Sequence, residues 1–167
     1  MLLYHGSNLA VENPKLINQQ RGLDFGAGFY LTTSEQQAHR FSEIVVNRRK
    51  SGFPIVNVYE FDWEIAEKTL AICKFESANA EWLKYVTDNR LKAYTGDEYD
   101  VVIGAVANDQ VMPTIQAFLG GFLNQEAALI TLKTSKLVDQ ICLKSEKALS
   151  LLRFVKSLEI EGGRIDG

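Results

Sequence analysis

The segment Tyr4-His5-Gly6-Ser7 combines residue types that could bind a sugar and a planar amide. An imidazole can donate to or accept from a sugar hydroxyl, and a glycine lets a flat carboxamide approach the backbone N–H and C=O groups closely. A histidine in this setting is more often a surface residue in a turn. His5, Gly6 and Ser7 therefore become candidate binding residues only if a second segment supports them.

A second segment runs from Gly26 to Tyr30 as Gly-Ala-Gly-Phe-Tyr and leads into an expected helix that carries Phe41. Glycines at alternate positions permit unusual backbone angles, and the aromatic side chain after them offers a flat face for a nicotinamide ring. The pair Gly26 and Gly28 lacks the third glycine of a dinucleotide-binding Rossmann turn. Taken alone, Tyr30 is more readily interpreted as a core aromatic than as a stacking platform.

Together, and in this order, the two segments resemble the ADP-ribosyltransferase superfamily, in particular the His-Tyr-Glu branch that includes the poly(ADP-ribose) polymerases and diphtheria toxin. The resemblance implies an α+β fold with a split β core and flanking helices, and NAD as the substrate. It also implies a catalytic His5 bonded to the nicotinamide-side ribose, a Gly6 backbone that holds the carboxamide, and a nicotinamide ring sandwiched between Tyr30 and Phe41. Two more residues complete the expected NAD contacts, namely Ser7 and Gly28.

Two positions depart from this family pattern. The polymerase-type helix carries a serine where this chain has Ala38, so that contact is missing or comes from Ser34 or Thr33. A later strand resembles the one that delivers the family's catalytic glutamate, and the matching catalytic residue is here Gln140. An amide can bind a ribose hydroxyl but cannot act as a general base. Without the resemblance, Gln140 would be interpreted as an exposed polar residue on an edge strand.

Nearly the whole chain also resembles a bacterial family of small toxin-type transferase-like domains, on segments that include Asp24-Phe25-Gly26 and Ala107-Asn108-Asp109. This resemblance implies a cognate antitoxin protein as a partner. Asn108 and Asp109 could lie near the acceptor, although helix capping is the plainer interpretation of both. If Gln140 is not the catalytic group, three acidic residues are the next candidates: Asp139, Asp109 and Glu146.

Three functions remain open at this point. The first is an NAD-dependent transferase that attaches single ADP-ribose units to an unknown macromolecular acceptor. The second is an NAD glycohydrolase, in which water takes the place of the acceptor. The third is a non-catalytic module that binds NAD or ADP-ribose, which Gln140 favours because it lacks a negative charge. The transferase is the function that we expect.

Length, composition and charge limit the number of domains and the classes of partner that can be expected. The 167 residues, 46% of them apolar, predict one domain over residues 1–160 and a flexible tail over residues 161–167. A formal charge of −3 gives no global footprint for nucleic acid. Cys73 and Cys142 have no second cysteine or histidine at ligand spacing, so no metal is expected. No apolar run reaches the roughly 18 residues of a membrane span, and we expect a cytoplasmic protein without membrane contact.

Periodicity predicts strands interspersed with helices, without a regular βαβ alternation, which is typical of an α+β domain. Helices are expected after Thr33 or Ser34, after Ser77, and over residues 109–119, 125–132 and 147–158. Strands are expected over residues 2–4, 55–61, 70–75, 99–107 and 138–143, and a strand or loop over residues 25–32. A loop is expected from residue 8 to residue 24.

Overall fold

A computed structural model describes residues 1–16, 22–108 and 110–161 of the chain. Its strands are β1 (Leu2–Ser7), β2 (Phe29–Thr32), β3 (Ile55–Phe61), β4 (Ile72–Lys74), β5 (Val101–Ala105), β6 (Asp139–Leu143) and β7 (Leu152–Glu159). Its helices are α1 (Glu35–Arg49), α2 (Trp63–Thr69), α3 (Ala80–Arg90), α4 (Met112–Leu119), α5 (Gln125–Lys133) and α6 (Glu146–Ser150). The predicted mixture of helices and strands is confirmed.

The seven strands form one mixed sheet in the order β4-β5-β6-β2-β1-β3-β7. Only the β4–β5 pair is parallel, and the other neighbours are antiparallel. The split β core that the resemblance implied would place the strands in two small sheets, and this division is wrong because β1 and β2 are paired and join the strands into one sheet. Their junction is narrow, since it consists of the single registered pair Tyr4 and Thr32.

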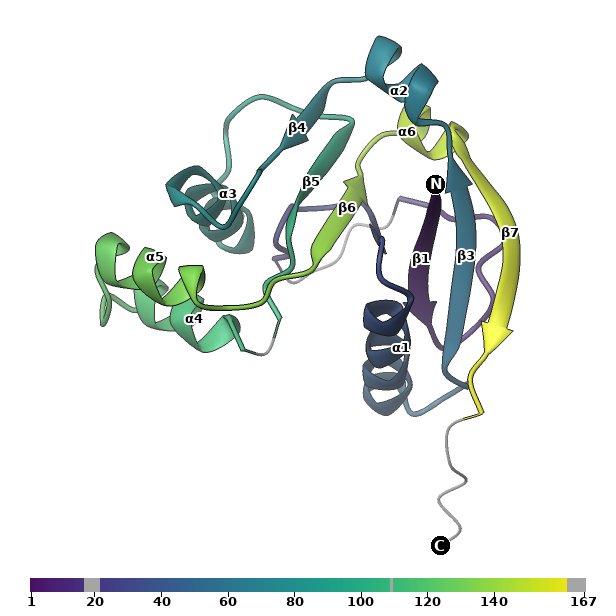
Figure 1. The fold of residues 1–167 in the computed structure, drawn as a ribbon, viewed down its shortest axis with the longest axis horizontal. Helices are drawn as coiled ribbons and strands as arrows, with labels where there is room; N and C mark the ends of the chain where they lie inside the picture. Colours follow the sequence, from purple (N-terminus) through teal and green to yellow (C-terminus); the bar gives the residue numbers. More distant parts are fainter. Residues whose placement is uncertain (17–21, 109, 162–167) are drawn as a thin grey trace, which may run out of the picture.

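Two apolar clusters lie on the two sides of this sheet. The first contains Cys142 and Val102 and packs under α3, α4 and α5. The second contains Ile141 and Leu143 and packs under α2 and α6. Because successive strand residues point to opposite faces, β6 alternates between the two clusters. Figure 1 shows α3, α4 and α5 beside the β4–β6 half of the sheet and α1 against β1.

Helix α1 begins where the sequence predicts it. The Ser34 side chain accepts a hydrogen bond from the backbone N–H of Gln37, which satisfies one free donor of the first turn. The buried side of α1 consists of Ala38, Ser42 and Val45. Phe41 was expected on this side, but it is 39% exposed, because the helix face that packs on β1 contains Ser42 and not Phe41.

The predicted helix over residues 147–158 is wrong. A short helix ends at Ser150, and the chain continues as β7, which pairs antiparallel with β3 from Phe61–Leu152 to Ile55–Glu159. The apolar residues of this segment fit a helical stripe locally, but pairing with a neighbouring strand satisfies its backbone and buries Phe154 against Tyr59. Pairing with β3 therefore decided the structure of this segment, although its apolar residues have the spacing of a helix.

Several smaller differences complete the comparison with the sequence. Helix α2 was not predicted, although Asp62 caps it by accepting from the N–H of Ile65. Helix α3 was predicted, but Asn79 caps it rather than Ser77. The expected start of the fourth helix at Asp109 and the tail from residue 162 onward lie outside the described residues.

Candidate functional site

His5 bridges β1 and β2 just beyond the point where their backbones stop pairing. Its Nδ1 lies 2.7 Å from the backbone oxygen of Tyr30. A carbonyl oxygen only accepts hydrogen bonds, so Nδ1 carries the proton and Nε2 is left as an acceptor in the neutral ring. Burial lowers the pKa of His5, which keeps the imidazole neutral near pH 7. The ring also packs on Phe29, with 4.4 Å between the ring centroids.

Gly6 is the point where α1 approaches β1 most closely. A Cβ atom at this position would lie 2.0 Å from the backbone oxygen of Ala38 and 2.8 Å from the backbone nitrogen of Ser42. The helix backbone therefore fills the space that a side chain would occupy. Ser7, the next residue, is buried as well. The expectation that the Gly6 backbone holds a carboxamide stays a prediction.

The turn before β2 is held by one nearby side chain, Tyr30, and by one that is distant along the chain, Lys144. The Tyr30 hydroxyl accepts from the N–H of Phe25 at 3.0 Å and donates to the oxygen of Gly26 at 2.6 Å. The Lys144 ammonium donates to the oxygens of Phe25 and Ala27. Gly26 has φ of +76°, a backbone angle that favours glycine. The phenol of Tyr30 is thus part of the scaffold that holds this turn.

Gly28 is required by packing rather than by its backbone angle. A Cβ atom there would lie 2.4 Å from Sγ of Cys142 on the neighbouring strand β6. Burial raises the pKa of Cys142 to about 12, so this thiol stays protonated at neutral pH. The absence of a side chain at Gly28 therefore allows the turn before β2 to pack directly against Cys142 of β6.

The rings of His5 and Tyr30 leave the sheet on opposite faces. Tyr30 is registered with Cys142 and packs on the first apolar cluster, whereas His5 packs on Phe29 of the second cluster. The two residues are adjacent through the Tyr30 backbone, but their rings do not lie side by side. The expected sandwich of a nicotinamide ring between Tyr30 and Phe41 stays a prediction, with Phe41 as the more exposed of the two rings.

Gln140 lies on β6 in the interior of the sheet, between β2 and β5, and its exposed fraction is 8%. The alternative interpretation of an exposed residue on an edge strand is therefore wrong. Its Nε2 lies 3.1 Å from Oδ2 of Asp24 and 3.4 Å from the oxygen of Ala105. Both partner atoms are hydrogen-bond acceptors, so the amide nitrogen of Gln140 points toward Asp24 and Ala105, and its amide oxygen points away from them.

Asp24 is the centre of this buried polar cluster and is 7% exposed. Its Oδ1 accepts from Nε and Nη2 of Arg90 at 2.7 and 2.5 Å, and its Oδ2 accepts from the N–H of Ala107 at 3.2 Å. Sequence reasoning quoted Asp24 as part of a family pattern but gave it no role. It missed Arg90 and Lys144 altogether, because their partners lie 66 or more residues away along the chain.

The remaining candidate residues lie elsewhere. The Asn108 side chain accepts from the N–H groups of Gln110 and Val111, which agrees with a local capping role ahead of α4. Asp139 is exposed at the start of β6, and Glu146 is exposed in the first turn of α6. Asp109 is outside the described residues.

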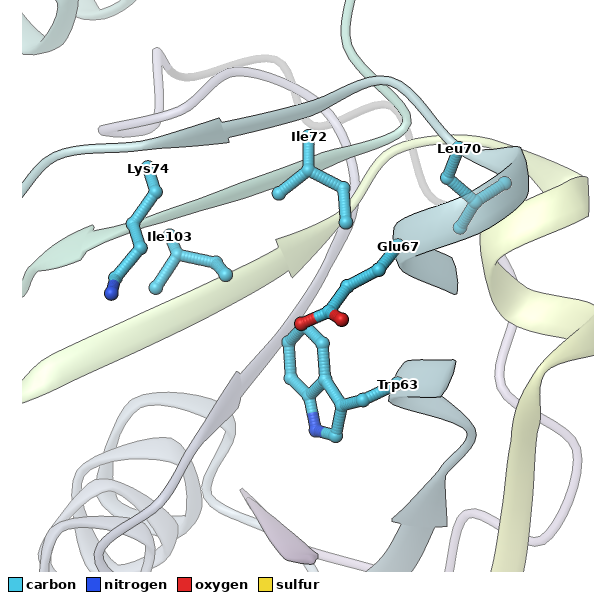
Figure 2. A pocket seen from close by; sticks show the side chains of 6 residues that line it. All are labelled: Trp63, Glu67, Leu70, Ile72, Lys74 and Ile103. Atoms are coloured by element: carbon cyan, nitrogen blue, oxygen red, sulfur yellow. The ribbon is translucent and has the colours of Figure 1, made fainter. Parts of the chain in front are cut away.

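A separate cavity of about 340 Å³ opens on the side of the second cluster, next to α2 (Figure 2). Its walls are Trp63, Glu67, Leu70, Ile72, Lys74 and Ile103. Figure 2 shows the Glu67 carboxylate beside the Trp63 ring and Lys74 at the other end. No residue of the sequence-predicted site lines it. This cavity is therefore an alternative candidate ligand site, and filling it by substitution can serve as a control for ligand binding near His5.

Among residues 1–16, 22–108 and 110–161, no cluster of three His, Cys, Asp or Glu side chains is arranged to hold a metal ion. The same residues include no helix with the length and apolar character of a membrane span.

The family model described as "Protein of unknown function (DUF3990)" matches residues 1–154, and the chain belongs to this family. No curated protein matches the chain. No solved structure matches it either. The matched range includes His5, Tyr30 and Gln140, together with the polar cluster around Asp24.

Proposed function

We propose that this domain binds NAD and transfers a single ADP-ribose unit to a macromolecular acceptor. The observation that carries the proposal is that three separate sequence motifs lie on three neighbouring strands, with the ring of His5 on one face of the sheet and that of Tyr30 on the other. His5, Tyr30 and Gln140 belong to β1, β2 and β6, which are consecutive in the sheet. The contact of His5 with the Tyr30 backbone adds a direct link between the first two motifs.

His5 has the properties of a ribose-binding residue. With its Nδ1 proton engaged by Tyr30, the neutral ring offers Nε2 as an acceptor for a sugar hydroxyl. Phe41, exposed on α1, offers a flat face for the nicotinamide ring. Gly6 and Ser7 continue the strand from His5 and would supply backbone contacts to the carboxamide.

The reaction breaks the bond between the nicotinamide nitrogen and the anomeric carbon while the acceptor forms a new bond to that carbon. Nicotinamide leaves with the bonding electron pair, and the acceptor loses its proton to water or to a base of its own. A neutral Gln140 cannot take that proton. A bound acceptor can still react, because proximity contributes much of the rate, and water lacks that advantage.

A non-catalytic NAD-binding module is the second candidate. The observation that favours it is the engagement of the Gln140 amide with Asp24 and Ala105, which leaves no carboxylate free at the expected catalytic position. Glycohydrolase activity is expected only as a slow side reaction. A transferase that consumes NAD inside a cell would also need a cognate antitoxin protein, and growth arrest on expression without it would support that partner.

Calorimetric titration with NAD tests the binding step. His5→Ala and Phe41→Ala are expected to weaken binding, whereas Phe122→Ala removes an exposed aromatic from the α4–α5 loop and is expected to have no effect. Ile72→Trp fills the cavity beside α2 and is also expected to leave binding unchanged. Loss of NAD binding in Ile72→Trp, with His5→Ala unaffected, would move the ligand to that cavity and refute the proposed site.

Incubation with labelled NAD and a cell lysate tests the transfer step. Label that is lost only after protease digestion indicates a protein acceptor, and label lost only after nuclease digestion indicates a nucleic acid. Binding of NAD without any labelled macromolecule or released nicotinamide would favour the non-catalytic module. No binding at all would refute the proposal.

A further inference from the structure

The amide of Gln140 is held in one orientation. Its Nε2 donates both hydrogens to acceptors, one to Oδ2 of Asp24 at 3.1 Å and one to the oxygen of Ala105 at 3.4 Å. The reversed amide would set its oxygen against two acceptors and leave its nitrogen without them. Oε1 is therefore the end of the side chain that points away from these two acceptors, and no described residue donates a hydrogen bond to it.

Asp24 is itself held firmly enough to impose this orientation. Arg90 from α3 occupies Oδ1, and the N–H of Ala107, just after β5, shares Oδ2 with Gln140. The carboxylate is buried and receives donors from three different segments, so it cannot rotate away without breaking several hydrogen bonds. Its position follows from the fold and not from Gln140 alone.

We propose that Asp24 is a positioning residue that makes Gln140 a hydrogen-bond acceptor, through Oε1, for a sugar hydroxyl. This inference rests on the proposed function for the identity of the sugar, the ribose of NAD. An acceptor oxygen is also what a glutamate would present to that hydroxyl. Gln140 then performs the binding part of the glutamate role, and Asp24 ensures that the correct end of the amide points outward.

The inference reverses the simplest expectation for Gln140→Glu. Family resemblance predicts that glutamate keeps or raises transfer. In this structure the new carboxylate would face the Asp24 carboxylate and the Ala105 oxygen across the 3.1 and 3.4 Å contacts that now carry hydrogen bonds. Two carboxylates that share a buried site cannot both be ionised without strong repulsion, so one pKa rises. The substitution is therefore expected to damage the site at neutral pH.

A double-mutant cycle tests this inference with Gln140→Glu, Asp24→Asn and the double variant D24N/Q140E. Thermal unfolding is measured for each at about pH 5 and about pH 8. A carboxyl whose folded pKa is raised contributes stability at low pH and loses it as the pH rises, so Q140E should be impaired more at the higher pH. The double variant, with one carboxylate fewer, should unfold at a higher temperature at that pH than the two single effects predict.

NAD affinity supplies the readout that a purely structural role would not move. Q140E is expected to bind NAD at least about tenfold more weakly at the higher pH and to recover part of that loss at the lower pH. The control Arg90→Lys keeps a positive donor for Asp24, and so the Asp24–Gln140 contact, but loses the two-nitrogen hydrogen bonding of the guanidinium. It should lower stability without introducing this pH dependence of NAD binding.

The outcomes separate this inference from the proposed function. Additive effects of D24N and Q140E on unfolding, or a Q140E variant that binds NAD as tightly as the parent at both pH values, would overturn the positioning role even if the parent binds NAD. Failure of the parent to bind NAD would overturn the proposed function and the ribose assignment. Coupling in the unfolding cycle would then still support the orienting contact.

Discussion

Nδ1 of His5 lies 2.7 Å from the backbone oxygen of Tyr30, and this contact joins β1 to β2 where their backbone pairing ends. The His5 side chain therefore links the two strands by a hydrogen bond where backbone hydrogen bonds between them are no longer formed. Because the imidazole fills this place as a donor, its other nitrogen is fixed as an acceptor. The neutral protonation state of His5 and the distance between β1 and β2 at this point therefore depend on the same hydrogen bond.

The stability of the protein should fall as the pH decreases below the ordinary pKa of histidine, about 6.5. Burial lowers the pKa of His5 in the folded state, so the unfolded chain takes up the proton first. Stability from the neutral ring is present above that value and is lost, by at most about 1.4 kcal/mol per pH unit, toward the lowered pKa. His5→Asn keeps a donor but does not titrate. Denaturant unfolding from about pH 8 to pH 5 should show a flatter profile for H5N, and equal slopes would contradict the assignment.

Gly6→Ala should strongly destabilise the fold, because its Cβ would lie 2.0 Å from the backbone oxygen of Ala38 and α1 would have to move. A cost of about 3 kcal/mol or more is expected, at the upper end for overpacking, since a helix backbone cannot rotate aside. Gly120→Ala is the matched control, because its close neighbours are mainly atoms of the exposed Phe122 side chain. Similar losses in both variants would show that α1 does not pack on Gly6.

Tyr30→Phe should loosen the turn before β2 while preserving the packing of the ring. The hydroxyl accepts from the N–H of Phe25 and donates to the oxygen of Gly26, so its removal should cost about 1 to 3 kcal/mol in unfolding experiments. Limited proteolysis should also become faster at this turn. Tyr94→Phe is the control, since that hydroxyl donates only to the oxygen of Asp97 at an exposed position. Indistinguishable stabilities of the two variants would refute the bridging role of Tyr30.

Phe154→Ala and Val155→Ala distinguish a strand from the helix that the sequence predicted. In β7, Phe154 is registered with Tyr59, and the two rings meet edge to face with 5.8 Å between centroids. Val155 points outward and is 40% exposed. Phe154→Ala should cost about 2 kcal/mol, less than a fully buried phenylalanine, whereas Val155→Ala should cost under about 1 kcal/mol. The reverse order in chemical denaturation would favour the helix.

The sequence by itself determined the elements whose signals are local. The strand over residues 55–61 was predicted with the bounds that the structure has, because its β-branched and aromatic residues have few alternatives. The sequence also predicted a helix cap at Thr33 or Ser34, because a hydroxyl residue before an apolar helical period is a strong start signal, and the structure has the cap at Ser34. The resemblance also assigned His5 and Tyr30 to one NAD site, which stays a prediction; the structure shows that the His5 ring contacts the Tyr30 backbone.

Only the tertiary structure decided what depends on partners far along the chain. Residues 152–159 became a strand because β3 offered an edge, although their apolar spacing also fits a helix. The opposite faces of His5 and Tyr30 follow from strand register, which a one-residue shift would reverse. Gln140 is buried because β5 and β2 flank β6, and it meets Asp24 across 116 residues of sequence. Hydrogen bonds of such range leave no periodic trace in a sequence, because any polar residue can serve as the partner once the fold brings it near.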